Sequence, residues 1–471
     1  MGPQASLEEL LVLHAHRMAW RTQDGDYSYQ DLAERIARVR CQLAELEAEA
    51  GSIWVLHGLK PFDAFTLLLA GMQSGLRMVQ LPERQPWPVL QQLLHQVPWQ
   101  GLIVAEELIH DETRQITWVD LRSLQGKKPV PIAYDSYRSS FGIFSSGSTG
   151  IPKAFMHSWN SLRSAAQASI DYYQGLPGDS WLLSLDLAHI GGLQIAMRSL
   201  LAGGCCVHLA EPKNLSLALA SFIPDFVSLV PSQLYRLLAD NAAILILSQA
   251  KVLILGGAAA APDLVDQALG KGLRISVSYG STETAALLAA TLPGQRPQAA
   301  DDAGEVLPHW EILSHGEQLW IKGPAATQGF YQDGILHECL NADGWLLLPD
   351  RIVCEGRRLK VMGRWDQVFQ VAGENVSAAE ILLALETFRH LAEFIILPIE
   401  DKNYGHVPVL IIRSMQEPDI LPILNLLQTR LSGIKRPVQV FWHASAEVNK
   451  ISQSYYIEAL KQGKLALLWK K

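Results

Sequence analysis

The segment FSSGSTGIPKAF, residues 144–155, places serine, threonine and glycine directly after a short apolar run. Glycine lets a backbone turn tightly and point successive N–H groups at one spot. The hydroxyl groups add donors that rotate to suit a ligand, and Lys153 adds a positive charge. The segment therefore suits a polyphosphate, although no G-K-[ST] ends it as in a Walker A loop. A plain flexible turn is the alternative that this segment leaves open by itself.

Short apolar runs alternate with amphipathic stretches on both sides of this segment. The runs expected to be buried strands are residues 52–57, 101–105, 205–210, 226–230 and 251–257. One expected helix carries apolar residues at helical spacing, namely Leu32, Ile36, Val39, Leu43 and Leu46. Another begins at Ser6, which has the spacing of a capping box with Glu9. Alternating strands and helices predict an α/β fold in which helices cover parallel-rich sheets.

The pattern changes after about residue 360, where a smaller α+β unit is expected. We place a large N-terminal domain at residues 1–363 and a small C-terminal domain at residues 364–471. The expected elements are an antiparallel meander at 356–373, a helix from Ser377, strands at 392–399 and 407–414, a helix at 420–431 and a strand at 438–443. The basic tail, residues 461–471, is expected to be a solvated helix end rather than a membrane contact.

Composition excludes several classes of protein. A net charge of −8 argues against a nucleic-acid-binding protein, which usually presents a basic face. The five cysteines include no C-x-x-C pair, which argues against a zinc site or a disulfide framework. No leader pattern is visible, and no apolar run reaches the roughly 18 residues that span a bilayer. We expect a cytoplasmic protein without a membrane span, whose homo-oligomeric state the sequence leaves open.

Further motifs follow the opening segment in order. SSGSTGIPK resembles the phosphate loop of the adenylate-forming superfamily, which includes acyl-CoA synthetases, nonribosomal peptide adenylation domains and luciferases. LGGAAA at 255–260 is similar to the segment that lies against adenine, and YGSTET at 279–284 to the Y-G-x-T-E motif. Asp350 stands at the position of a ribose-binding aspartate, the segment from Gly363 resembles the hinge, and Lys450 stands at the position of the C-terminal lysine. Each match is weak singly, but six in order identify the chain as a member of this superfamily.

The resemblance implies a mobile small domain that rotates about a hinge at Asp366 between two half-reactions. A carboxylate first attacks the α-phosphate of ATP to give an acyl adenylate, which a thiol then attacks. Thr282 is implied to contact the α-phosphate, Glu283 to hold Mg²⁺, and Lys450 to bridge the carboxylate and the ribose or α-phosphate. The implied ATP-binding residues are Ser145, Ser146, Gly147, Ser148, Thr149, Gly150, Lys153, Gly256, Gly257, Ala258, Tyr279, Gly280, Ser281, Asp350 and Arg364.

Three longer segments, 181–204, 228–238 and 404–411, resemble the o-succinylbenzoate–CoA ligases of menaquinone or phylloquinone synthesis. That likeness implies small-molecule substrates: ATP, o-succinylbenzoate and CoA. It places His189 at the wall between the acyl pocket and the CoA channel, where Gly191 and Gly192 let the pantetheine arm pass. A satisfied core histidine is the alternative for His189.

Arg198 lies in the apolar stretch LQIAMRSLLAGG, where a fatty-acid pocket has little use for a cation. The likeness implies that it receives the second carboxylate of o-succinylbenzoate, because a buried anion needs a cationic or strong donor partner. An arginine that extends to the surface is the alternative.

The motifs also depart from the superfamily at two places. Leu348 and Pro349 replace the usual T-G before Asp350, and Val448 and Asn449 replace the usual S-G before Lys450. Asparagine also tolerates left-handed φ, so we interpret the second loop as altered but competent. Three alternative functions stay open: another aryl or short-chain acyl-CoA synthetase, a stand-alone adenylation protein that loads a carrier protein, and a non-enzymatic nucleotide-binding relative.

Overall fold

The computed structural model describes residues 6–81, 87–104, 118–119, 135–145, 152–209, 214–365, 368–371, 374–389, 391–401, 405–431, 433–445 and 453–470. The chain divides into two compact units. The larger unit comprises Met1–Ser145, Pro152–Leu313 and Trp320–Leu347, and the smaller comprises Ser146–Ile151, Ser314–Leu319 and Leu348–Lys471. The domain boundary expected between residues 363 and 364 lies inside the smaller unit and stays a prediction about which segments move together.

The first sheet of the larger unit is built around a parallel centre. Its strands lie in the order β2 (Asp26–Ser28), β1 (Met18–Thr22), β10 (Cys205–His208), β9 (Ser180–Leu182), β11 (Phe226–Leu229), β12 (Val252–Leu255), β13 (Ile275–Tyr279), β14 (Ala289–Ala290) and β15 (Asp302–Val306). Pairing is parallel from β1 through β13, whereas β2, β14 and β15 pair antiparallel. The expected parallel-rich sheet is therefore confirmed.

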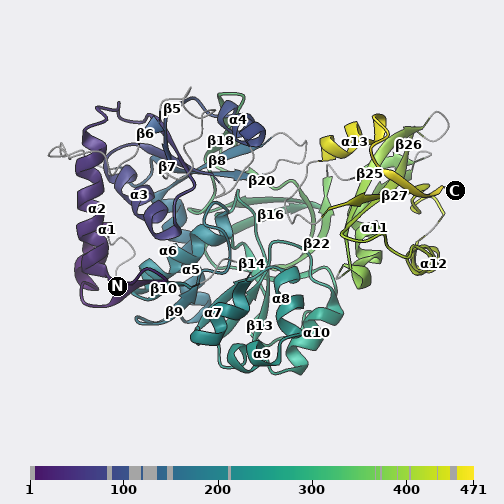
Figure 1. Ribbon diagram of the computed structural model, residues 1–471, viewed down its shortest axis with the longest axis horizontal. Coiled ribbons are helices and arrows are strands. Elements are labelled where there is room, and N and C mark those ends of the chain that lie inside the picture. Colours follow the sequence, from purple (N-terminus) through teal and green to yellow (C-terminus); the bar gives the residue numbers. More distant parts are fainter. Residues whose placement is uncertain are drawn as a thin grey trace. The chain divides into compact units, whose positions relative to one another are not determined.

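A second sheet of the larger unit holds the two strands on either side of the expected phosphate loop. Its order is β19 (Ile335–Glu338), β18 (Gly329–Gln332), β8 (Lys153–Ser158), β7 (Ser139–Ser145), β4 (Arg77–Gln80), β3 (Ile53–His57), β5 (Trp99–Val104) and β6 (Trp118–Val119). β7 and β8 pair antiparallel with Ser145 opposite Lys153, so both ends of the loop between them lie side by side. Figure 1 shows β7 and β8 next to each other near β18.

Helices cover both sheets of the larger unit (Figure 1). They are α1 (Leu7–Leu13), α2 (Tyr29–Ala44), α3 (Pro61–Gln73), α4 (Trp87–His95), α5 (Trp159–Tyr173), α6 (Ile190–Ala202), α7 (Leu215–Ser221), α8 (Pro231–Leu238), α9 (Asn241–Leu247) and α10 (Pro262–Gly270). The capping box at Ser6 is confirmed, with the Ser6 N–H donating to Glu9 Oε2 at 2.7 Å. Four of the five apolar positions predicted in α2 are buried on one face, whereas Leu46 lies beyond the end of the helix.

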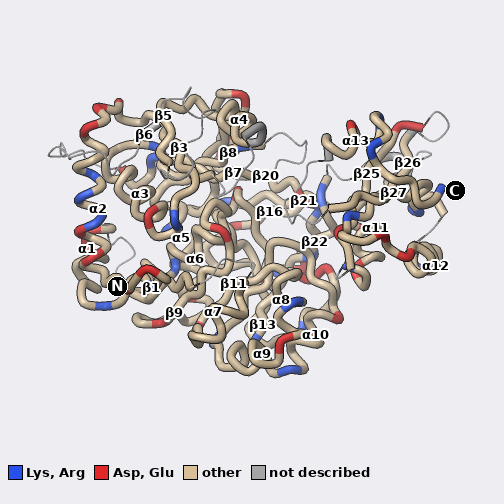
Figure 2. Tube along the Cα trace, viewed as in Figure 1, with Lys and Arg blue, Asp and Glu red and all other residues tan. Residues whose placement is uncertain are grey.

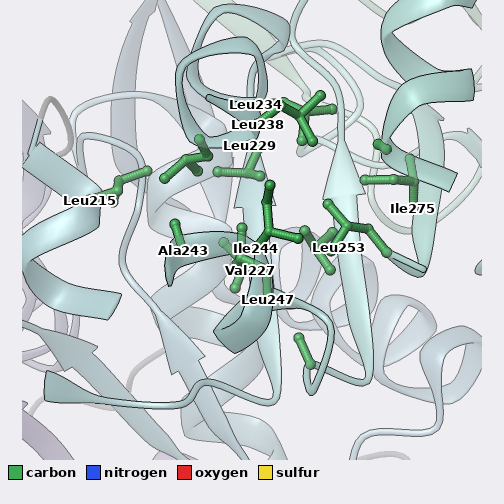
Figure 3. Packing of buried hydrophobic residues seen from close by; sticks show 14 of the residues in the cluster. Leu215, Val227, Leu229, Leu234, Leu238, Ala243, Ile244, Leu247, Leu253 and Ile275 are labelled. Carbon is green, nitrogen blue, oxygen red and sulfur yellow. The ribbon is translucent and has the colours of Figure 1, made fainter. Parts of the chain in front are cut away.

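Apolar packing around the parallel centre fixes the position of the strand ends. Figure 3 shows Val227 and Leu229 of β11 and Leu253 of β12 packed among leucine, isoleucine and alanine side chains of α7, α8 and α9. Leu253 and Leu247 are fully buried in this cluster. Burial of this kind stabilises a fold by about 25 cal/mol per Å² of apolar surface. The loops that leave these strands therefore begin from well-fixed positions.

Charged side chains are distributed without separation by sign. Figure 2 shows basic and acidic segments interspersed along α2. Among the helices that the structure describes, none combines the length and the apolar character needed to cross a membrane.

The smaller unit corrects two of the expectations. β21 (Asp350–Glu355) pairs with β22 (Arg358–Arg364), and β23 (Val368–Val371) pairs with β24 (Glu374–Ser377), so the expected meander is two separate hairpins. The basic tail begins with Lys461, which ends a helix, but its larger part forms β28 (Ala466–Lys470), which pairs antiparallel with β27 (Gln439–Ala444) instead of staying a solvated helix end. Leu468 and Trp469 pack against the core of this unit, which outweighs the charge of the flanking lysines.

Four further elements of the smaller unit agree with the sequence. They are α11 (Ala378–Ala384), β25 (Glu393–Asp401), β26 (Gly405–Ser414) and α12 (Leu421–Arg430). The sequence did not predict the 3₁₀ turn Glu386–Phe388 or α13 (Gln453–Lys461). The sheet runs β24, β23, β26, β27, β28, with β25 also paired to β26. Strands β16 (Glu311–His315), β17 (Gln318–Lys322) and β20 (Leu346–Leu347) lie between residues 311 and 347, a stretch that is divided between the two units. All five cysteines are free.

The buried hydroxyl of Tyr29 secures the C-terminal end of α6. It lies 3.0 Å from the Ser199 carbonyl oxygen, 3.1 Å from that of Leu200 and 3.0 Å from that of Gly204. Tyr29→Phe is expected to lower stability by about 1–3 kcal/mol, because buried carbonyl groups lose their donor. Thermal unfolding measures the effect. Tyr27→Phe is the matched control, because no hydrogen bond joins the Tyr27 hydroxyl to a described residue; equal losses in both variants would contradict the assignment.

Candidate active site

Three of the predicted site segments meet at one edge of the first sheet. His189 follows β9, residues 256–258 follow β12, and residues 280–283 follow β13. These strands are parallel neighbours, apart from β11 between β9 and β12, so their carboxyl ends share one edge. Ligands of open α/β sheets bind at this edge. The structure therefore brings together the segments that the sequence assigns to adenine, phosphate and the acyl–CoA boundary.

The turn after β13 is tightly constrained. A Cβ added to Gly280 would lie 1.3 Å from the Ala286 carbonyl oxygen, so only glycine fits there. Ala285 and Ala286 have φ of +49° and +86°, in the left-handed region that non-glycine residues rarely adopt. The Thr284 hydroxyl accepts from the Ser281 N–H at 2.9 Å and lies 2.9 Å from the Ala286 carbonyl oxygen. Strain held by such contacts is typical of functional turns.

Contacts from the second sheet hold the carbonyl groups of this turn. The fully buried His157 of β8 lies with Nε2 2.9 Å from the Thr282 carbonyl oxygen. The Thr327 N–H donates to the Glu283 carbonyl oxygen at 2.9 Å. The side chains of Thr282 and Glu283 are partly exposed and make no hydrogen bond with a described residue. Both side chains are therefore left for a ligand, whereas the backbone is fixed.

Lys153 and Glu283 share one electrostatic neighbourhood. Burial raises the pKa of the Cys339 thiol to about 12, with the Glu283 charge raising it further and the Lys153 charge opposing it. The Lys153 ammonium lies 4.6 Å from the centroid of the Phe330 ring, in the geometry of a cation–π contact. A positive and a negative group placed together in this way suit a metal-bound polyphosphate.

The start of α6 brings His189 and the two glycines together. His189 is exposed, is the N-cap of α6 and makes no side-chain capping bond, so the alternative of a satisfied core histidine is wrong. A Cβ added to Gly192 would lie 2.0 Å from the Asp186 carbonyl oxygen, which makes the absence of a side chain there a packing requirement. Gly191 is less crowded, with its nearest neighbour, a Leu185 methyl group, at 3.0 Å from an added Cβ.

Arg198 is a buried cation with an unsatisfied nitrogen. It is only 4% exposed, so it does not extend to the surface. Its Nε has no hydrogen-bond partner among the described residues. Burial lowers the pKa of Arg198 to about 10, opposed only by the charge of Tyr173, so the side chain stays positive at neutral pH. A buried charge without a partner is costly, which points to an anionic ligand.

The smaller unit holds two predicted site residues in one hairpin. Asp350 begins β21 and Arg364 ends β22, where the two residues are direct cross-strand partners. Leu348, one of the departures from the superfamily pattern, is fully buried, and the Pro349 carbonyl oxygen accepts from the Trp365 N–H at 3.0 Å. The replacement of T-G by Leu348 and Pro349 is therefore accommodated by packing that leaves Asp350 at the strand end.

Comparison with known proteins extends these observations. The family described as AMP-binding enzyme matches residues 12–331, more than half of the chain. The chain belongs to the AMP-binding enzyme family. A similar relative, the 2-succinylbenzoate–CoA ligase of Salmonella typhimurium, is 29% identical over 425 residues, 89% of each chain.

Solved structures of AMP-binding enzymes share the fold of this chain. One is o-succinylbenzoate CoA synthetase (MenE) from Bacillus subtilis in complex with the acyl-adenylate intermediate OSB-AMP, with a TM-score of 0.82, 21% identity and 94% of each chain covered. The same enzyme in complex with ATP and a magnesium ion gives a TM-score of 0.82 at 21% identity, covering 94% of this chain and 96% of the other. The likeness confirms the expected fold class, a large α/β region with a smaller sheet unit.

The donor set of this AMP-binding enzyme fits Mg²⁺ that arrives with a phosphate ligand. The described residues contain no group of three or more His, Cys, Asp or Glu placed to hold a metal. Mg²⁺ in nucleotide sites usually binds one or two carboxylates and completes its shell with phosphate oxygens and water. The single carboxylate of Glu283, with no hydrogen-bond partner among the described residues, matches that need.

Several predicted residues lie outside the described part of the chain. They are Ser146, Gly147, Ser148, Thr149, Gly150, Asp366 and Lys450. Tyr279, Ser281 and Ala258 lie at the carboxyl edge with their neighbours. The sequence did not single out His157 or Thr327. His157 lies four residues after Lys153, so strand alternation was a signal that both face one side.

Gly280→Ala is expected to abolish the turn that carries Thr282 and Glu283. A misplacement of about 1 Å typically costs 10²-fold in rate, so ATP-dependent pyrophosphate release should fall by at least about 100-fold. Gly270→Ala is the control, because nothing lies within 4 Å of a Cβ added there. If Gly280→Ala releases pyrophosphate at the parent rate, the turn accommodates a Cβ at position 280 and the packing argument is wrong.

Proposed function

We propose that this AMP-binding enzyme is an ATP-dependent ligase that joins o-succinylbenzoate to CoA through an acyl adenylate, for menaquinone or phylloquinone synthesis. The similar curated relative acts, by its name, on 2-succinylbenzoate and CoA. The observation that carries the proposal to this chain is the buried, incompletely partnered Arg198. ATP and CoA are both available in the cytoplasm, where we expect the enzyme to work, with a homo-oligomer as one possible state.

The first half-reaction joins two anions and needs positive charge. A carboxylate oxygen attacks the α-phosphorus, the bond to the bridging oxygen breaks, and pyrophosphate leaves with that electron pair. Thr282 donates to the α-phosphate, Lys153 and the loop from Ser145 to Gly150 bind the β- and γ-phosphates, and Glu283 binds Mg²⁺. Bound Mg²⁺ neutralises phosphate charge. Such chemistry depends on positioning and electrostatics rather than on covalent help from the protein.

The second half-reaction transfers the acyl group to a thiol. The thiol proton of CoA passes to water, the sulfur forms a bond to the acyl carbon, and the bond from that carbon to the phosphate oxygen breaks, so that AMP leaves with the electron pair. The sequence resemblance implies that His189, which is exposed at the start of α6, lies at the acyl–CoA boundary. Gly191 beside it is partly exposed, whereas Gly192 is buried, so only Gly191 is left to border a pantetheine arm. Asp366 as the hinge and Lys450 as the bridging cation of adenylation complete the proposal from the resemblance.

Recognition of the acid depends on its second carboxylate. o-Succinylbenzoate carries one carboxylate for activation and another on the ring. An arginine offers two parallel N–H donors to a carboxylate, which lysine cannot reproduce. Arg198 is still charged at neutral pH, with a pKa of about 10, and its Nε has no described partner. Pairing with the ring carboxylate supplies the interaction that the buried cation lacks.

Pyrophosphate release with a panel of acids, with and without CoA, tests the function. We expect release with o-succinylbenzoate and thioester formation when CoA is added. Preference for another aryl or short-chain acid would identify a different acyl-CoA synthetase. Thioester formation on a carrier protein but not on CoA would identify a carrier-loading enzyme. Absence of pyrophosphate release with every acid tested would favour a non-enzymatic relative.

Arg198→Ala is expected to weaken binding of o-succinylbenzoate by about 3–5 kcal/mol, because the ring carboxylate is left buried and unpaired. Its KM should rise steeply, whereas the KM for ATP should stay nearly constant. Benzoylpropionate, which lacks the ring carboxylate, should be a poor substrate of the parent enzyme and lose little further in the variant. Steady-state kinetics of both acids with both proteins make this comparison a double-mutant cycle.

The control for Arg198 is Arg236→Ala, which removes an exposed arginine of α8. We expect this variant to keep the parent KM for both acids. If Arg198→Ala affects both acids equally, Arg198 is a structural residue and the substrate assignment loses its main physical support.

Lys450→Ala is expected to separate the half-reactions. Loss of one charge-assisted contact to a transition state typically costs about 10²–10³ in rate, so acyl-adenylate formation should fall by that factor. Conversion of supplied acyl adenylate to thioester should persist. Rapid-quench measurement of each step checks the expectation, and equal loss of both steps would remove Lys450 from a role specific to adenylation.

A further inference from the structure

One face of strand β8 runs from the phosphate loop to the turn after β13. Lys153, Phe155 and His157 alternate along β8, so their side chains share a face. Phe330 of β18 lies beside the first two: its ring centroid is 4.6 Å from the Lys153 ammonium and 5.2 Å from the Phe155 ring centroid. The third residue, His157, contacts the Thr282 carbonyl group. A single strand therefore joins two parts of the proposed ATP site.

The contact of His157 with the turn has a defined direction. A carbonyl oxygen only accepts, so the Nε2 that lies 2.9 Å from the Thr282 oxygen carries the proton. The Ser161 hydroxyl lies 3.4 Å from Nδ1, the nitrogen that is left to accept. Burial lowers the pKa of His157 to about 4, so the ring is neutral at the pH where such enzymes work. Its role is to hold a fixed hydrogen bond rather than to transfer protons.

The next carbonyl group of the turn, that of Glu283, is also held by a hydrogen bond. The Thr327 N–H donates to the Glu283 carbonyl oxygen at 2.9 Å, and the Thr327 hydroxyl donates to that of Met156 at 2.9 Å. Met156 precedes His157 in β8, so two successive carbonyl groups of the turn are fixed to β8 and the chain leading into β18. The side chain of Glu283 has no such anchor, and its position depends on its backbone.

We propose that His157 is a positioning residue for adenylation: it fixes the Thr282–Glu283 turn relative to Lys153, so that the Mg²⁺ carboxylate and the phosphate-binding lysine engage one ATP molecule. The inference rests on the proposed roles of Glu283 and Lys153. A histidine that only fills the core would not need its one donor aimed at the backbone of a site residue. Substitution of a residue that orients a metal ligand without contacting the metal typically changes metal affinity or activity by about 10–100-fold.

The test compares His157→Leu, which removes the donor, with His157→Gln, whose amide nitrogen reaches the Nε2 position. Isothermal titration calorimetry of AMP without Mg²⁺, and of ATP with and without Mg²⁺, measures the contribution of Mg²⁺ directly. We expect His157→Leu to reduce the gain in ATP affinity from Mg²⁺ by about 10–100-fold. AMP affinity should stay within about threefold, and His157→Gln should recover most of the gain.

Met156→Ala is the matched control, because it removes a fully buried neighbour in β8 without removing a donor to the turn. Met156→Ala should lower the Tm as His157→Leu does, but the gain in ATP affinity that Mg²⁺ gives should stay intact. Parallel loss in both variants would overturn the proposal and make His157 a packing residue. If His157→Leu does not fold, His157→Asn replaces it, because its shorter amide does not reach Thr282; full Mg²⁺ gain in His157→Asn would also overturn the proposal.

A half-reaction assay separates this inference from the proposed function. With o-succinylbenzoate, His157→Leu should slow pyrophosphate release and leave thioester formation from supplied acyl adenylate within about threefold. Should the parent enzyme accept a different acid, the calorimetry still decides the role of His157, since it needs no acid. Equal slowing of both steps would contradict a role confined to adenylation.

Discussion

Parallel pairing from β9 through β13 forces the loops that follow these strands onto one edge of the sheet. His189, Gly256 and Thr282 are far apart in the sequence, and each follows a different strand of this set. The apolar packing shown in Figure 3 keeps the strands in register, so the loops begin from fixed points. Everything proposed for ATP and acyl binding in the larger unit depends on this shared edge.

The second constraint is the join between the two sheets of the larger unit. The turn after β13 carries the side chains proposed to bind phosphate and metal, yet it has little room: Gly280 admits no side chain, and Ala285 and Ala286 have positive φ. Hydrogen bonds from His157 and Thr327 hold it from the other sheet. Backbone strain of this kind persists only where surrounding contacts over-determine it.

Much of this arrangement was predictable from sequence, because it depends on local patterns. Buried strands, the Ser6 cap and the α2 stripe follow from spacing alone. The ordered motifs supply the candidate site residues, whose roles stay predictions. The wrong predictions concern tertiary contacts between segments that are distant in the sequence. Strand pairing in the smaller unit is decided by which partner buries the apolar face, so β22 pairs with β21 instead of forming a meander. The tail was judged by its lysines, although Leu468 and Trp469 direct it into the sheet.

In the candidate site too, the motifs indicate which residues are involved, whereas the contacts that hold them appear only in the structure. A motif names Thr282 and Glu283, but no motif states what holds their backbone, because His157 comes from a different sheet. Arg198 was recognised by its apolar surroundings, whereas its burial and its unpartnered Nε required coordinates. The domain boundary and the roles of Asp366 and Lys450 stay predictions.

Cys339 bears on the selectivity of the proposed chemistry. An acyl adenylate is an electrophile, and only a thiolate attacks it rapidly. A resident thiolate would compete with CoA and leave the enzyme acylated on itself. Burial and the Glu283 charge raise the pKa of Cys339 to about 12, so this thiol stays protonated at neutral pH. Burial, reinforced by the charge of Glu283, thus keeps this thiol protonated and a poor nucleophile.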